Sequence, residues 1–211
     1  LQARVAGPFA GVSPADDRWD RLRSVPHPTR DLDRVTAYAD ATVDHAETMA
    51  ALWDDGETVA VDEAMTELTL DVFLDALFGA DADHHERRSA LGAACGGRPA
   101  GDGDRIRETV HAFAAKHDAS VPAAVPDWVP TRTNRRYRAA LVAFDDVVEG
   151  LGERRRAAGF EGCRDLLSVL LRADGDLDES TVADTLLAFL VTAAETTAAA
   201  LTFTVHALTT T

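Results

Sequence analysis

Apolar positions in this chain recur at steps of three and four residues, the spacing that places side chains along one face of an α-helix. One such run extends from Asp31 to Gly56, and a second begins at Asp62 and ends at Gly79. Further runs cover 19–25, 84–94, 106–116, 133–158 and 165–172. Residues 57–61 alternate briefly and predict a short strand. The chain is therefore expected to be mainly α-helical, and nothing in it repeats at a fixed period.

The last helix is predicted over 178–209 and is the longest, with Asp178 as a favourable N-cap residue. At about 1.5 Å per residue it would be roughly 45 Å long, enough to cross a whole domain. Its most apolar part, 186–208, contains Glu195, His206 and several threonines. Because a membrane span is normally more uniformly apolar, this segment is expected to be a buried core helix and not a span.

Composition narrows the classes of function. The chain has 211 residues, 46% of them hydrophobic, and a formal net charge of −15, which suits one globular domain or a large piece of one and argues against nucleic acid and anionic membranes as partners. Lys116 is the only lysine and aspartate is spread along the chain. This resembles proteins of salt-loving organisms such as halophilic archaea, in which salt screens self-repulsion; a GC-rich genome, which favours arginine codons, is the alternative.

Two cysteines, Cys95 and Cys163, cannot build a disulfide framework and fit a reducing compartment. No signal peptide is visible, so a cytoplasmic location is expected. Adjacent His84 and His85 with Glu86 could suggest a metal site, but neighbouring histidines on a helix point apart. No metal site is therefore predicted, and no phosphate-binding glycine motif is present.

An acidic residue interrupts the last helix, which reads LLAFLVTAAETTAAALTF around Glu195. Burial of a carboxylate costs several kcal/mol or changes its protonation, so its presence needs a reason. Threonine hydroxyls such as that of Thr196 can bond the carbonyl four residues back and loosen the helix locally. An acid beside a hydroxyl can relay protons, whereas a buried acid can also pair with a distant arginine. The spacing alone leaves both alternatives open.

The segment FLVTAAETTAAAL resembles the oxygen-activating helix of the cytochrome P-450 family, whose pattern is Ala/Gly-Gly-x-Asp/Glu-Thr-Thr/Ser. The resemblance implies that Glu195 and Thr196 are the catalytic acid–alcohol pair that delivers protons to oxygen at the haem, and that Ala193 lies over the haem face. The chain departs from the pattern at Thr192 and Ala193, where Ala-Gly is usual. A methyl group there changes the shape of the oxygen groove.

Other segments resemble the same family in the same order. DDRWDRLRSVPHPTR is similar to its Trp-x-x-x-Arg helix, which implies that Trp19 and Arg23 bind the haem propionates. An arginine suits a carboxylate through its bidentate fork, although a surface helix with one half-buried tryptophan would read alike. LTLDVFLDALFG, PDWVPTRTNRRYRAAL and DLLSVLLRADGDLDESTVADTLL are similar to later segments of the family. The resemblance therefore extends over nearly the whole chain.

Two motifs of the family have no counterpart in the expected place. These are a Glu-x-x-Arg pair and the loop Phe-x-x-Gly-x-Arg-x-Cys-x-Gly, both of which normally follow the oxygen-activating helix. Glu153 with Arg156, and Glu161 with Arg164, match the pair only by spacing. Neither Cys95 nor Cys163 fits the loop, so the axial thiolate is absent from this chain. We expect 1–211 to be one incomplete P-450-like domain without the N-terminal sheet region or the haem-thiolate loop.

The resemblance implies a haem-dependent monooxygenase that inserts one oxygen atom into a small apolar substrate, with Phe189 lining the substrate pocket. Electrons would come from a ferredoxin- or flavoprotein-type donor. Haem is expected in the full-length enzyme, and this chain alone is expected to be inactive. The alternative is a non-enzymatic all-helical ligand-binding or regulatory module.

Overall fold

The computed structural model describes residues 32–79, 101–117, 128–160, 163, 165–172 and 179–210, and everything below concerns these residues. They form α-helices and no strand. The helices are α3 (Leu32–Ala50), α4 (Val61–Phe78), α5 (Asp102–His117), α6 (Arg132–Ala157), α7 (Leu166–Arg172) and α8 (Glu179–Thr209). The mainly helical architecture is confirmed. The short strand predicted over 57–61 is wrong, because irregular turns lead directly into α4.

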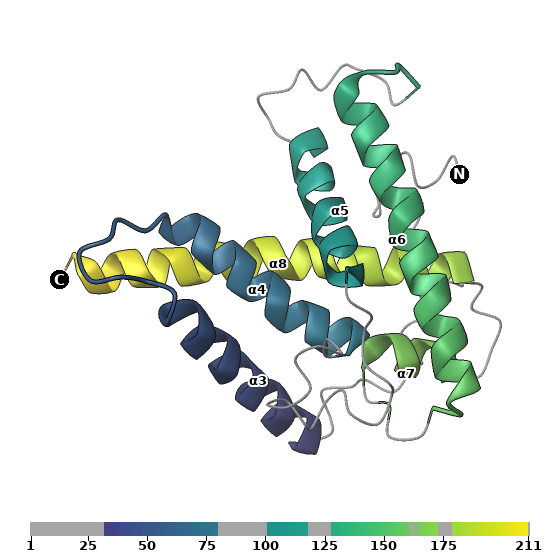
Figure 1. Cartoon of the computed structure of the whole chain (residues 1–211), viewed down its shortest axis with the longest axis horizontal. Coiled ribbons are helices and arrows are strands. Elements are labelled where there is room, and N and C mark those ends of the chain that lie inside the picture. The colour runs from purple at the N-terminus through teal and green to yellow at the C-terminus, as the bar shows by residue number, and fades with distance from the viewer. Residues whose placement is uncertain are drawn as a thin grey trace, which may run out of the picture.

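The helices are arranged as two antiparallel pairs that meet on the long helix α8 (Figure 1). α4 lies along α8, and α3 packs on α4. α5 and α6 form the second pair, which rises from the part of α8 nearer its N-terminus, and the short helix α7 fills the corner between α4, α6 and α8. α8 is therefore the helix on which both pairs and α7 pack.

One continuous apolar cluster joins α4, α5, α6, α7 and α8. The fully buried side chains at its centre come from every one of these helices: Leu70, Leu74, Phe78, Ile106, Phe144, Leu151, Leu167, Leu186 and Leu190. The rings of Phe78 and Phe144 meet edge to face, with centroids 6.0 Å apart. Each buried leucine or phenylalanine contributes roughly 1.5–3 kcal/mol relative to an exposed one, so this cluster supplies most of the driving force that assembles the layers.

α3 adds little to that cluster and is fastened by polar contacts. The buried imidazole of His45 lies 2.9 Å from Oδ2 of the buried Asp75 on α4 and 3.7 Å from Oδ2 of Asp71. Asp71 is in turn paired with Arg107 of α5. These contacts link three helices, and they hold α3 at one rotational setting on α4.

A buried guanidinium joins the end of α4 to α6 and α7. Arg155 is 0% exposed, and its Nη2 donates to the carbonyl oxygen of Phe78 at 2.9 Å. Its Nε lies 3.4 Å from Oδ2 of Asp165, which is 1% exposed and accepts hydrogen bonds from the backbone N–H and hydroxyl of Ser168. Gly79 follows α4 with φ +82°, and a Cβ there would meet Arg155 Nη2 at 2.9 Å. Glycine at 79 is thus needed for both conformation and space.

The α5–α6 pair carries contacts along its length. Thr131 caps α6 by accepting from the backbone N–H of Asn134 at 3.0 Å, and the hydroxyl of Thr109 donates to the carbonyl of Ala140 at 3.0 Å. On the surface, Arg136 makes a two-pronged contact with Glu108 at 2.5 and 2.8 Å. The hydrogen bond from Arg136 lowers the pKa of the Glu108 carboxyl below its ordinary value of 4.5.

We predict that Arg155→Met destabilises the folded protein far more than Arg154→Met. Loss of Arg155 leaves the buried carboxylate of Asp165 unpaired, which costs about 3–5 kcal/mol. Arg154 is the control, because its side chain is 45% exposed and its partner Asp102, at 3.3 Å, keeps a second ion pair with Arg105 at 3.9 Å; its loss should cost clearly less than the loss of Arg155. Denaturant unfolding of both variants checks this, and equal losses would contradict a structural role for the buried guanidinium.

We predict a pH dependence confined to acid conditions at the Glu108–Arg136 pair. Because the folded-state pKa of Glu108 lies below the unfolded value, its contribution to stability is present above pH 4.5 and is lost as the pH falls through the lower folded value. In Arg136→Gln the midpoint of the Glu108 titration should rise toward 4.5. Carboxyl NMR titration measures it, with Arg135→Gln as the neighbouring control that should leave the midpoint unchanged.

Candidate functional site

α8 has two different halves. Up to Val191 it is largely enclosed, with buried residues Thr181, Val182, Ala183, Leu186, Leu187, Leu190 and Val191. Beyond that point only Ala194 and Ala198 are buried, and most other positions are exposed. The prediction of a buried core helix therefore holds for the first half and is wrong for the second. Among the described helices α4 packs along α8, and the side of α8 that carries Ala194 and Ala198 is the buried one.

α8 is also the one helix in the described part of the chain that is long and apolar enough to cross a membrane, judged by length and composition alone. A third of its apolar window is buried against the other helices. Core helices of globular proteins meet the same criterion, so the pattern does not by itself indicate a span.

The acid expected to be buried is exposed. Glu195 lies on the open side of α8, one residue from the buried Ala194, and the neighbouring Thr196 and Thr197 are exposed too. Within the described residues no arginine forms an ion pair with Glu195. At position 195 the described residues therefore show neither a buried carboxylate nor a structural salt bridge.

The threonines next to Glu195 bond the helix backbone as the sequence predicts. The Thr196 hydroxyl donates to the carbonyl of Thr192 at 2.8 Å and lies 3.4 Å from that of Ala193. The Thr192 hydroxyl donates to the carbonyl of Ala188 at 2.8 Å. Each proton is thereby held by the backbone, and the lone pairs of each hydroxyl oxygen are left to accept hydrogen bonds from outside the helix.

Four residues of α8 share one open face beside Glu195. Phe189, Thr192, Ala193 and Thr196 follow the three- and four-residue spacing of helix neighbours. Phe189 is 52% exposed, Thr192 and Thr196 are exposed, and Ala193 is half-buried. A large apolar ring, two hydroxyls and a small side chain thus lie together, and this face can contact an apolar group while offering hydrogen bonds to a polar one.

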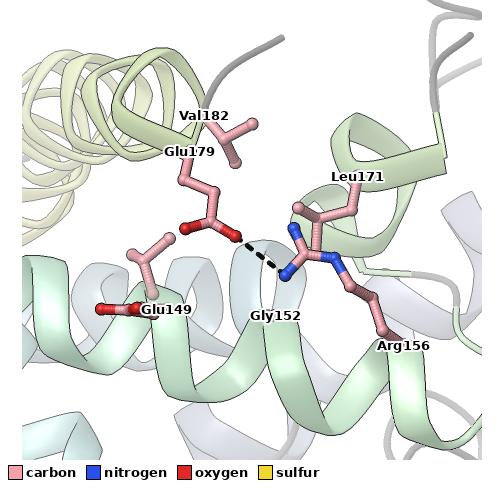
Figure 2. Close-up of a pocket in the computed structure, with 7 residues that line it drawn as sticks. Glu149, Gly152, Arg156, Leu171, Glu179 and Val182 are labelled. Atoms are coloured by element: carbon pink, nitrogen blue, oxygen red, sulfur yellow. Dashed lines mark ion pairs between the residues drawn. The ribbon is translucent and has the colours of Figure 1, made fainter. Parts of the chain in front are cut away.

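A separate hollow lies where α6, α7 and α8 meet (Figure 2). Its volume is about 190 Å³ including space open to solvent, and its wall contains Val148, Gly152, Leu171 and Val182. Across its mouth Arg156 Nη1 pairs with Glu179 Oε1 at 2.9 Å, so the arginine of the Glu153–Arg156 spacing match binds a residue of α8. Glu179 is sixteen residues before Glu195, roughly 24 Å along the helix. The hollow is therefore remote from the acid–hydroxyl face.

Other residues singled out in the sequence fall in different places. Cys163 is 3% exposed and disulfide-bonded, which differs from the reduced thiol expected. In the described ranges no group of three or more His, Cys, Asp or Glu side chains could hold a metal ion. Trp19, Arg23, His84, His85, Glu86 and Cys95 lie outside the described residues.

Thr192 was noted in the sequence only as a departure from a pattern, and its hydroxyl was overlooked as a binding group. The sequence contained this information, because a threonine four residues before Thr196 lies on the same face of the helix, one turn away. Its hydrogen bond to the Ala188 carbonyl places its oxygen on the same face of α8 as Ala193 and Thr196. The candidate site is thus the face of Phe189, Thr192, Ala193 and Thr196 together with Glu195.

Comparison with known proteins gives concordant matches. The family model for cytochrome P-450 matches residues 9–211. Cyclooctat-9-en-7-ol 5-monooxygenase of Streptomyces melanosporofaciens is 30% identical over 214 residues, which cover 97% of this chain and 42% of that protein. The crystal structure of a mutant cytochrome P450DA heme domain is similar with a TM-score of 0.58 and 18% identity, over 91% of this chain and 39% of that one. This chain spans less than half the length of these relatives.

Proposed function

The chain belongs to the cytochrome P-450 family, and on that premise we propose that the complete protein is a haem-dependent monooxygenase. The reaction inserts one atom of O₂ into a C–H bond of an organic substrate and reduces the other to water, with two electrons from a donor protein and two protons. The observation that carries the proposal is the family match over 9–211, which includes the Glu195–Thr196 pair on an open face of α8. A match over nearly the whole chain disfavours the alternative of a non-enzymatic helical module.

The residues of α8 fit one side of a haem group. Small side chains flank the two hydroxyls, with Ala193 half-buried and Ala199 and Ala200 exposed, so a flat ring can approach the helix closely. Haem with a thiolate ligand supplies the reduction of O₂ and the cleavage of its O–O bond. We assign the oxygen side of the haem to this chain, its propionates to Trp19 and Arg23, and its axial cysteine to a part of the protein beyond this chain.

In this function Glu195 and Thr196 divide the handling of protons. The exposed carboxylate of Glu195 takes up protons from water and releases them toward the reacting oxygen. Thr196, fixed by its hydrogen bond to the Thr192 carbonyl, accepts a hydrogen bond and holds the donor in place. The pair combines an exchangeable acid with a fixed acceptor, as proton delivery at a defined point requires.

We propose a small apolar substrate, because the site's open face carries Phe189 and alanines. The relative from Streptomyces melanosporofaciens acts, by its name, on a cyclic hydrocarbon that bears one hydroxyl group. A substrate of the same class, apolar with a single alcohol, suits a face that mixes a phenyl ring with hydroxyls. A ferredoxin- or flavoprotein-type donor would supply the electrons.

We further propose that the protein comes from a salt-adapted organism, a halophilic archaeon being the type. The support is a net charge of −15 with a single lysine. Such a charge self-repels in dilute solution and is screened within a few ångströms at molar salt.

The direct test is spectroscopic. The full-length protein that contains this chain, loaded with haem, reduced and exposed to CO, should show the red-shifted Soret band of a thiolate-ligated haem. We expect that the chain of 211 residues alone does not show it, because neither of its cysteines fits the family's haem-thiolate loop pattern. A full-length protein that binds no haem, or shows the band of histidine ligation, would overturn the proposed function.

We predict that Thr196→Ala uncouples oxygen consumption from product formation. Without the acceptor at 196 the proton donor is not held in place, and general acid–base assistance is commonly worth 10²–10⁴-fold. The fraction of consumed O₂ that appears as hydrogen peroxide should rise by roughly tenfold, with an unchanged haem spectrum. Thr204→Ala, a threonine of α8 with the same type of backbone bond, is the control. Unchanged coupling in Thr196→Ala would remove Thr196 from proton delivery.

A further inference from the structure

Asp71 of α4 faces nitrogen-bearing side chains from two other helices. Its Oδ1 accepts a hydrogen bond from Arg107 Nη2 of α5, and its Oδ2 lies 3.7 Å from His45 Nδ1 of α3. A separation of 3.7 Å is beyond hydrogen-bond reach and still within the range of an ion pair. One carboxylate is thus bound directly by α5 and only approached by α3.

α3 depends on such polar contacts more than α5 does. The main apolar cluster includes side chains of α5 and none of the described side chains of α3. The described part of α3 buries one apolar side chain, Ala41, which packs with Tyr38. A second hydrogen bond to the buried His45 would therefore change the attachment of α3 far more than the loss of one would change that of α5.

Arg107 has other partners besides Asp71. Its Nη1 lies 3.2 Å from Oδ1 of Asp104 on its own helix, and its Nε lies 3.8 Å from Oε2 of Glu67 on α4. Asp104 is 84% exposed and Glu67 52% exposed, and water also reaches Asp71 and Arg107. Because ion pairs between hydrated groups are worth little, a change of partner there costs little. Arg107 can therefore leave Asp71 without leaving a buried charge unpaired.

The imidazole of His45 has one ring nitrogen toward each of two carboxylates. Nε2 lies 2.9 Å from Asp75 Oδ2, and Nδ1 faces Asp71. An imidazole with a proton on each nitrogen has two N–H donors, one for each of these carboxylates. The charged groups that the described structure places at the ring are Asp75 and Asp71 of α4 and, behind Asp71, Arg107 of α5. A carboxylate drawn toward Arg107 is drawn away from His45.

We propose that Asp71 is a shared carboxylate for which α3 and α5 compete, so that a firmer hold by one helix loosens the other. While Arg107 holds Asp71, α3 is attached chiefly through Asp75. When Arg107 turns to Asp104 and Glu67, the Asp71 carboxylate closes the gap to His45, and two carboxylates hold α3. The coupling is reciprocal, as any coupling between two binding equilibria must be. It involves no haem and does not rest on the proposed function.

The test is hydrogen exchange of the backbone amides of α3 in the full-length protein that contains this chain. It is carried out at about pH 5.5, an acidity at which an ordinary imidazole carries both protons. Arg107→Gln removes the competitor for Asp71, so α3 should open less often. Its exchange should slow by about three- to tenfold, the usual worth of one hydrogen bond. The amides of α6 and α8 report whether the rest of the fold is unchanged.

Three further variants separate competition for Asp71 from a general effect of charge. Arg105→Gln removes the same charge from α5, but Arg105 is 61% exposed and pairs with Asp102 of its own helix at 3.9 Å, so α3 exchange should not change. In an Asp71→Asn background, Arg107→Gln should have no further effect on α3. Asp104→Asn removes an alternative partner of Arg107 at an exposed position, so α3 exchange should stay the same or become faster.

Unchanged or faster exchange of α3 in Arg107→Gln overturns this inference. The same holds if α3, α6 and α8 change by equal factors, because that result would reflect global stability and not a shared carboxylate. Slower exchange that persists in the Asp71→Asn background, or that Arg105→Gln reproduces, overturns it too. Full-length protein without a thiolate-ligated haem overturns the proposed function and leaves this inference standing.

Discussion

The buried guanidinium of Arg155 fixes how α4, α6 and α7 are positioned relative to one another. Transfer of an arginine from water into a protein interior costs several kcal/mol, and only a complete set of partners offsets that cost. The Phe78 carbonyl and the Asp165 carboxylate provide partners from the end of α4 and the start of α7. If the guanidinium moved into less polar surroundings, it would lose these two partners. α4, α6 and α7 therefore meet in one arrangement, and Gly79 leaves the space that the guanidinium occupies.

The long helix α8 has a buried side that carries Ala194 and Ala198, and the polar residues one step further around the helix are exposed. The apolar cluster drives the layers together without specifying a register, whereas the buried ion pair and the His45–Asp75 contact depend on direction and distance. The candidate site is thus positioned by the packing of α8 beneath it.

Sequence periodicity was sufficient for the described helices, because each of their apolar runs has to face the common core, whereas the runs predicted over 19–25 and 84–94 lie outside the described residues. It was insufficient for burial. Glu195 stands in a run so apolar that the pattern places it inside, yet whether a helix face is covered depends on elements remote in the sequence. Likewise α6 carries Arg154, Arg155 and Arg156 in succession, and no local signal tells which one turns inward. The position of the Thr192 and Thr196 hydroxyls on one face of α8 could be predicted, since it depends only on spacing within one helix.

The surface contacts of the α5–α6 pair have a consequence for how the molecule responds to its solvent. Arg136–Glu108 is an exposed attractive pair and Arg154–Asp102 a partly exposed one, in a chain whose net charge is strongly negative. Dissolved ions screen repulsion and attraction alike. Salt therefore reduces the repulsion among the many negative charges and also weakens these two ion pairs. The buried Arg155–Asp165 pair is shielded from ions. Higher salt should therefore make the molecule as a whole more compact and the surface of the α5–α6 pair more mobile. The distribution of rigidity would then differ between concentrated salt and dilute buffer.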